Sequence, residues 1–139
     1  MAQEPAVQAT EQKNENEDYI INVEDVWKTY RMGDQEVHAL RGVNLNVIRG
    51  EYLSIMGPSG SGKTTLFNMV GALDTPSKGR VIVNGSNMGE LSQGQIAYLR
   101  CHSVGYIFQA FNLIPVMTAL ENVSLPMVFS GMARKEYEE

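Results

Sequence analysis

Apolar and polar positions alternate early in the chain and predict a β-hairpin. The mostly apolar segment Ile20–Val26 predicts a strand that begins at Tyr19 and runs towards Tyr30. A turn is predicted at Arg31–Glu36, because this segment contains a glycine followed by an aspartate. Alternation along His38–Val47 then predicts a second strand with one buried face.

Beyond this hairpin the pattern changes to strands alternating with helices, which is typical of an α/β fold. The predicted strands are Glu51–Met56, Gly79–Gly85 and Ser103–Phe108. The predicted helices are one with apolar residues Leu66, Met69, Val70 and Leu73, one beginning at Ser92, one beginning at Thr118, and Ala133–Glu139. The starts at Ser92 and Thr118 rest on capping-box spacing to Gln95 and Glu121. We expect an antiparallel layer from the first strands, packed on a partial core sheet that contains Glu51–Met56. The parallel part of this sheet is expected to be incomplete, with its other strands supplied by a missing half.

Charge is concentrated at the N-terminus. Residues 1–18 contain five acidic residues and Lys13 as the only base, and so carry −4 of the net charge of −5. They hold almost nothing to bury, which predicts a disordered acidic tail before an ordered region at 19–139. The ordered region is nearly neutral, so neither part predicts a surface for nucleic acid. No run approaches the roughly 18 apolar residues that span a bilayer, and the single cysteine, Cys101, excludes an internal disulfide.

The octapeptide GPSGSGKT at residues 57–64 carries the clearest chemistry. It matches the pattern G-x-x-x-x-G-K-[ST], and we call it the phosphate loop. Its glycines permit a tight wrap in which backbone N–H groups form an anion-binding nest, and the following helix adds its positive end. Lys63 can reach the β- and γ-phosphates, and the Thr64 hydroxyl is placed to bind Mg²⁺. The alternative is a glycine-rich turn that binds nothing.

Longer runs resemble a known family. The sequences VHALRGVNLNVIRGEYLSIMG, GPSGSGKTTLFNMVGALDTPSKGRVIVNG and VGYIFQAFNLIPVMTALENVSLPM resemble ATP-binding-cassette (ABC) ATPases, which are P-loop NTPases that bind ATP and Mg²⁺. The resemblance covers residues 20–139 and is strongest to the group serving macrolide efflux and lipoprotein release. It implies a partial ATP-binding domain, with the nucleotide-binding core to about residue 109 and the start of a helical subdomain at 110–139.

The resemblance also implies roles for individual residues. Tyr30 matches the aromatic position that stacks on adenine, with an ordinary surface or core tyrosine as the alternative. Gln109 matches the glutamine that senses Mg²⁺ and the attacking water, with an ordinary polar residue as the alternative. The implied catalytic residues are Lys63 and Gln109, and the implied metal-binding residues are Thr64 and Gln109. The implied nucleotide-binding residues are Tyr30, Gly57, Pro58, Ser59, Gly60, Ser61, Gly62, Lys63, Thr64 and Thr65.

As a family member, the chain is expected to act at the cytoplasmic face of the cell membrane, with a transmembrane permease subunit and a second ATP-binding subunit as partners. The region Phe111–Met132 would meet the permease, with its methionines either on that surface or in the core. The family's LSGGQ motif, acidic strand and switch histidine have no match. We therefore expect a fragment of a longer protein that binds nucleotide with negligible turnover. A small nucleotide kinase, a GTPase and a non-enzymatic binding module are the competing interpretations.

Two segments resemble the unmatched motifs in composition only. The run Leu91–Gln95, LSQGQ, precedes Gln109, whereas the family places LSGGQ after the glutamine, and Ser92 with Gln95 predicts a helix cap. The segment Ile20–Asp25 ends in two acids, but it precedes the phosphate loop and has them in reverse order. The remaining candidates for catalytic or metal-binding groups are predicted to be surface or strand residues: His38, Cys101 and His102.

Overall fold

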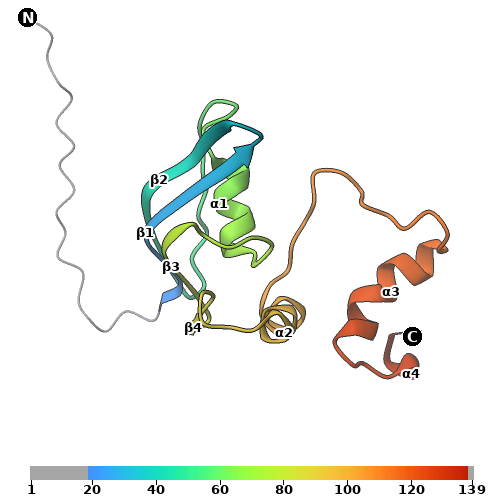
Figure 1. The fold of residues 1–139 in the computed structure, drawn as a ribbon. Helices are drawn as coiled ribbons and strands as arrows, with labels where there is room; N and C mark the ends of the chain where they lie inside the picture. Colours follow the sequence, from blue (N-terminus) through green and yellow to red (C-terminus); the bar gives the residue numbers. More distant parts are fainter. Residues whose placement is uncertain (1–18, 138–139) are drawn as a thin grey trace, which may run out of the picture.

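Two long antiparallel strands open the computed structural model, which describes residues 19–137. The elements are β1 Tyr19–Met32, β2 Gln35–Ile48, α1 Lys63–Val70, β3 Lys78–Val83, β4 Ser86–Asn87, α2 Gln93–Ser103, α3 Ala119–Phe129 and α4 Arg134–Tyr137. The strands form one sheet in the order β2-β1-β3-β4, antiparallel at every pairing (Figure 1). The predicted acidic tail and the last two residues of the predicted final helix lie outside the described residues.

The predicted hairpin is confirmed. Its turn is formed by Gly33 and Asp34, and Gly33 adopts the left-handed φ of +62° that a tight turn requires. Met32 then pairs with Gln35 across the turn.

A bulge at Asp25 decides which side chains of β1 face the helices. Asp25 has a φ of +44°, its N–H donates to the Asn44 side chain at 2.9 Å, and the register with β2 shifts between Val23 and Val26. Both of these valines are fully buried. Strict alternation would place them on opposite faces, so the inserted residue rotates the second half of β1.

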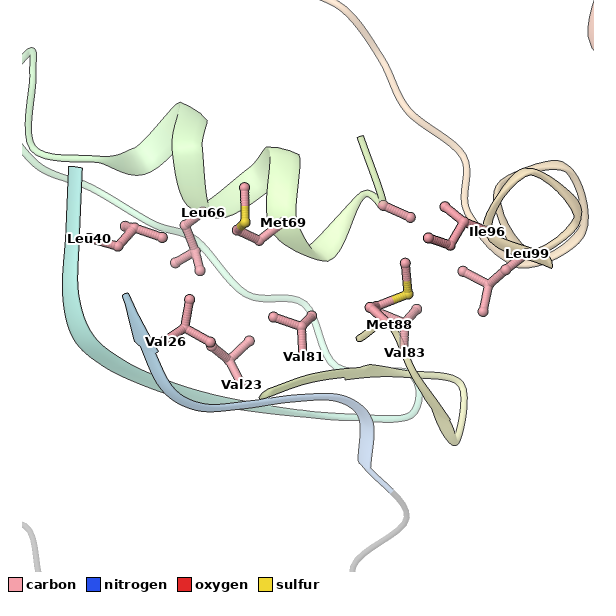
Figure 2. Close-up of a cluster of buried hydrophobic side chains, with 11 residues drawn as sticks. Val23, Val26, Leu40, Leu66, Met69, Val81, Val83, Met88, Ile96 and Leu99 are labelled. Carbon is pink, nitrogen blue, oxygen red and sulfur yellow. The ribbon is translucent and has the colours of Figure 1, made fainter. Parts of the chain in front are cut away.

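One face of the sheet packs against α1 and α2 (Figure 2). Helix α1 contributes Leu66 and Met69, which follow the phosphate loop directly, and α2 contributes Ile96 and Leu99. The buried cluster consists of Val23, Val26, Leu40, Leu66, Met69, Ala72, Val81, Val83, Met88, Ile96 and Leu99. Helix α1 packs against the sheet from its first turn. The phosphate loop therefore lies between β2 and a helix whose position is fixed by the buried cluster.

The strands predicted at Glu51–Met56 and Ser103–Phe108 are wrong for the described residues. Neither segment pairs with a strand within residues 19–137, and Ser103 is the last residue of α2. Tyr52 is 96% exposed and Ile107 is 97% exposed. A strand needs a neighbour to accept its backbone hydrogen bonds, and apolar composition alone does not provide one. The antiparallel layer and the α/β class are confirmed, but the predicted core sheet has no paired strand here.

Both predicted capping boxes are confirmed. In α2 the Gln95 side chain accepts from the Ser92 N–H at 2.9 Å, and the Ser92 hydroxyl accepts from the Gln95 N–H at 3.4 Å. In α3 the Glu121 carboxylate accepts from the N–H of Thr118 at 2.7 Å, and its bonds to Thr118 lower the pKa of Glu121. The LSQGQ run is therefore the start of a helix.

Helices α3 and α4 stand apart from the sheet, at the end of a long segment without regular structure (Figure 1). The methionines of this region, Met117, Met127 and Met132, lie outside the buried cluster, so packing in that core does not account for them. Among the described residues, no helix is both long and apolar enough to cross a membrane.

Candidate functional site

The phosphate loop ends in a helix start that has free backbone donors. Gly62 is the N-cap of α1, with a left-handed φ of +92°, and no side chain caps this end. The first turn also contains no acidic residue. The first N–H groups of a helix have no intrahelical acceptor, and the helix dipole places partial positive charge there. This end of α1 therefore offers several donors to an anion.

Gly62 is required by its neighbours as well as by its backbone angle. A Cβ at this position would lie 2.6 Å from the Ala39 carbonyl oxygen and 3.1 Å from Leu40 Cδ2. The loop therefore rests directly on the main chain of β2, at a distance that only glycine allows.

Lys63 folds back over the phosphate loop. Its Nζ donates to the carbonyl oxygens of Gly57 at 2.8 Å and Pro58 at 2.7 Å, and it lies 3.4 Å from the Ser61 hydroxyl. The ammonium group is thus held at the mouth of the loop by weak neutral acceptors. A phosphate oxygen, which carries charge, would be a stronger acceptor in the same place.

The loop also carries hydroxyl groups. Ser59, Ser61 and Thr64 are exposed, and Thr64 lies in the first turn of α1. Burial and Asp74 raise the pKa of Tyr30, and the Thr65 side chain acts in the opposite sense. The structure therefore brings Lys63 together with Gly57, Pro58 and Ser61, and places Tyr30 near Thr65 in the first turn of α1.

The Tyr30 side chain is fixed by Asp74 and Lys28, neither of which was predicted as a site residue. Its hydroxyl donates to Asp74 Oδ2 at 2.9 Å, and Lys28 Nζ donates to Asp74 Oδ1 at 2.7 Å and to the Thr75 carbonyl at 2.7 Å. The Lys28 ammonium also lies 4.9 Å from the centroid of the Tyr30 ring. The i, i+2 spacing on a strand could have paired Lys28 with Tyr30, but nothing local indicated Asp74.

These contacts shift two pKa values. Burial, followed by the hydrogen bond to Asp74, raises the pKa of Tyr30. Burial acts to raise the pKa of Asp74, but bonds from Lys28, the Thr75 N–H and Tyr30 together lower it below its ordinary value. At neutral pH Asp74 is therefore a carboxylate and Tyr30 a neutral phenol.

We expect Asp74→Asn to destabilise the fold at neutral pH by about 1 kcal/mol, the scale of one hydrogen bond. Because the folded-state pKa of Asp74 is lowered, its contribution is present above the unfolded pKa of about 4 and is lost as pH falls through the folded value. Urea denaturation of both proteins between pH 3 and 8 should show the difference shrinking in acid. A difference that is constant across this range would contradict the expectation.

Gln109 forms no hydrogen bond to the phosphate loop within the described residues, and it is exposed. The segment before it is attached further along α1, where the Tyr106 hydroxyl donates to Asn68 Oδ1 at 3.2 Å and the Tyr106 ring lies against Gly71. Its predicted role therefore remains a prediction.

The other candidate groups have local partners. His38 Nδ1 lies 2.9 Å from the Thr29 hydroxyl, and the His102 ring stacks on Tyr98 with a centroid distance of 3.9 Å. Cys101 is a free, exposed thiol. Within residues 19–137, no group of three or more His, Cys, Asp or Glu side chains is arranged to hold a metal ion.

Comparison with known proteins gives a consistent family assignment. The profile of the family described as ABC transporter matches residues 40–139. The chain is 46% identical over 117 residues to an uncharacterized ABC transporter ATP-binding protein of Thermotoga maritima, covering 84% of this chain and 50% of that protein. It is also 46% identical over 111 residues to the macrolide export ATP-binding/permease protein MacB of Bdellovibrio bacteriovorus, covering 80% of this chain and 17% of MacB.

Solved structures give the same result. The dimeric structure of a post-hydrolysis state of the ATP-binding cassette MJ0796 bound to ADP and Pi superposes with a TM-score of 0.79 at 44% identity, covering 84% of this chain and 52% of that chain. MJ0796 is a protein of Methanocaldococcus jannaschii. The chain thus spans about half the length of the single-cassette relatives that it matches.

Proposed function

Because this chain belongs to the ABC transporter family, we propose that it binds ATP with Mg²⁺ at residues 57–64 as part of the ATP-binding subunit of a membrane transporter. In the complete subunit, binding and hydrolysis of ATP would drive transport of a substrate across the membrane. The observation that carries the proposal is the combination of an uncapped helix end with the Lys63 ammonium above the same loop.

Each loop residue has a role that its position allows. We propose that Lys63 exchanges its two carbonyl acceptors for oxygens of the β- and γ-phosphates. The backbone N–H groups of Gly60 and of residues 62–65 would donate to the same phosphates, with Ser59 and Thr65 adding hydroxyl contacts. The Ser61 N–H already donates to the Pro58 carbonyl at 3.3 Å. No side chain has to be displaced from the helix end, because the N-cap residue, Gly62, forms no side-chain cap.

The Thr64 hydroxyl fits the needs of Mg²⁺. This ion keeps several waters and takes few protein ligands when phosphate oxygens are present, so a dedicated cluster of carboxylates is not required. Thr64 lies in the first turn of α1, next to the proposed phosphate position. When bound, Mg²⁺ would supply positive charge that offsets the negative charge of the phosphates. We propose that Thr64 and Gln109 are its protein ligands, with Gln109 arriving from the long connection to the helical region.

The assembly we propose follows the relatives. MacB is named as an ATP-binding/permease protein, and MJ0796 forms a dimer in its complex with ADP and Pi. We propose a transmembrane permease and a second ATP-binding subunit as partners here, at the cytoplasmic face of the membrane. The isolated helical pair α3 and α4, with exposed Phe129 and half-exposed Met132, is the part proposed to meet the permease.

Equilibrium titration with ATP and GTP, each with Mg²⁺ and with EDTA, tests the proposal. We expect Mg²⁺-dependent binding with a preference for ATP, weakened about tenfold or more in EDTA because the phosphates lose a bridging charge. For residues 1–139 alone we expect negligible hydrolysis, measured as phosphate release. Absence of Mg²⁺-dependent affinity in a protein with native circular dichroism would refute the proposal. Turnover that Lys63→Ala removes would refute the expectation of negligible hydrolysis.

A further inference from the structure

The contacts of Tyr30 join the two ends of the short helix α1. Near its start, the Thr65 side chain neighbours the Tyr30 hydroxyl and acts to lower the pKa that burial and Asp74 raise. Just after its end, Asp74 accepts the Tyr30 hydroxyl at 2.9 Å, and the Asp74 N–H donates to the Asn68 carbonyl of α1 at 3.2 Å. One helix therefore carries both the phosphate loop and the group that holds the tyrosine.

We propose that Asp74, itself fixed by Lys28, is a positioning residue that sets the Tyr30 ring as the platform for the base of the bound nucleotide. This inference rests on the proposed function, because it concerns the base of a nucleotide whose phosphates lie at residues 57–64. Asp74 would not touch the ligand. It would act only through the hydroxyl of Tyr30.

The geometry leaves one ring face for a base. The Lys28 ammonium lies 4.9 Å from the ring centroid, which places a cation over the ring and keeps that side occupied. On the neighbouring strand, Val37 pairs with Tyr30 and is 46% exposed. A flat ring beside an exposed apolar side chain is the kind of surface on which a purine stacks.

Lys28 and Asp74 form a firm support for this arrangement. Their side chains are 11% and 30% exposed, and the ion pair is 2.7 Å long. Lys28 also donates to the Thr75 carbonyl, and Asp74 accepts from the Thr75 N–H at 2.7 Å. A tyrosine that is ordered before binding loses less rotational freedom on stacking, so its support should increase affinity.

A purely structural role is the alternative, in which the cluster only fastens β1 to the loop after α1. The two roles differ in their effect on ligands. Positioning of the ring affects only ligands that have a base, whereas damage to the fold affects every ligand of the phosphate loop. The ratio of affinities for Mg²⁺–ATP and Mg²⁺–tripolyphosphate therefore separates them.

The test uses the full-length gene product and competition binding with these two ligands. We expect Tyr30→Phe and Asp74→Ala each to weaken ATP about threefold to tenfold, the effect of one hydrogen bond, while tripolyphosphate binding stays within about twofold. Because both changes remove the same bond, the double variant should be no weaker than Asp74→Ala. Glu36→Gln is the matched control, since it breaks an ion pair to Arg31 in the same hairpin without touching Tyr30.

Three results would overturn the inference. Equal loss of ATP and tripolyphosphate binding in Asp74→Ala would show a structural role only. If Asp74→Ala binds ATP as wild type does while Tyr30→Ala binds it more weakly, then Tyr30 is the base platform but Asp74 does not position it. Unchanged ATP binding in Tyr30→Ala would show that the Tyr30 ring is not the surface on which the base stacks. A wild-type protein that binds neither ligand would instead overturn the proposed function, and the inference with it.

Discussion

Replacing Lys63 with alanine is expected to weaken Mg²⁺–ATP binding, and the hydrolysis of the complete subunit, by about 100-fold or more. The side chain supplies the ammonium that lies 2.7–2.8 Å from the loop carbonyls, where the phosphates are proposed to bind. Removing a charged donor from two phosphate oxygens costs about 3 kcal/mol or more, at roughly 1.5 kcal/mol or above for each bond.

Filter binding or calorimetry measures the affinity, and phosphate release measures hydrolysis. Lys135→Ala is the control, because it removes the same charge from α4, apart from the loop (Figure 1). A Lys63→Ala protein that binds ATP within about threefold of wild type would contradict the proposed site.

Gly62→Ala is expected to have the largest effect on stability of any single change in the phosphate loop. The new methyl group would meet the Ala39 carbonyl oxygen at 2.6 Å, and the residue would keep a φ of +92° that alanine disfavours. Backbone strain and overpacking each cost about 1–3 kcal/mol, so we expect a loss of about 2–6 kcal/mol in the free energy of unfolding. Nucleotide binding should fall as well, because the loop must move away from β2.

Substitutions at two other glycines separate the cost of backbone strain from the cost of overpacking. Gly60 has a φ of +79°, and a Cβ added there would meet no neighbouring atom within 4 Å, so Gly60→Ala should cost only about 1–2 kcal/mol through strain. Gly94 lies inside α2 with open space around it, so Gly94→Ala should stabilise the protein by about 0.5–1 kcal/mol. Chemical denaturation gives all three values. Equal losses for Gly62→Ala and Gly60→Ala would show that the contact with Ala39 is unimportant.

Local signals in the sequence were sufficient for the hairpin, for the glycine-rich turn that precedes α1, and for the starts of α2 and α3. A glycine–aspartate turn, a glycine-rich loop and a capping box each act within a few residues, so their meaning does not depend on the rest of the fold. This is why Gly33, Ser92 and Thr118 were assigned correctly.

Pairing between distant segments was not predictable in the same way. Glu51–Met56 has strand-like composition, but pairing depends on a partner, and none exists within residues 19–137. The bulge at Asp25 has no strong local signature, yet it decides which residues of β1 face α1. The support of Tyr30 by Asp74 joins positions 44 residues apart, so only the folded chain shows it.

The contact between Gly62 and Ala39 has a consequence for ligand choice. Ala39 lies two residues from Val37 on β2, beside the proposed base platform, so the strand fixes the spacing between the two ends of a ligand at about 3.3 Å per residue. The site should therefore select ligands by the distance between their base and their phosphates. We expect nucleotides with a longer or shorter spacer between ring and phosphates to engage one end of the site or the other, but not both.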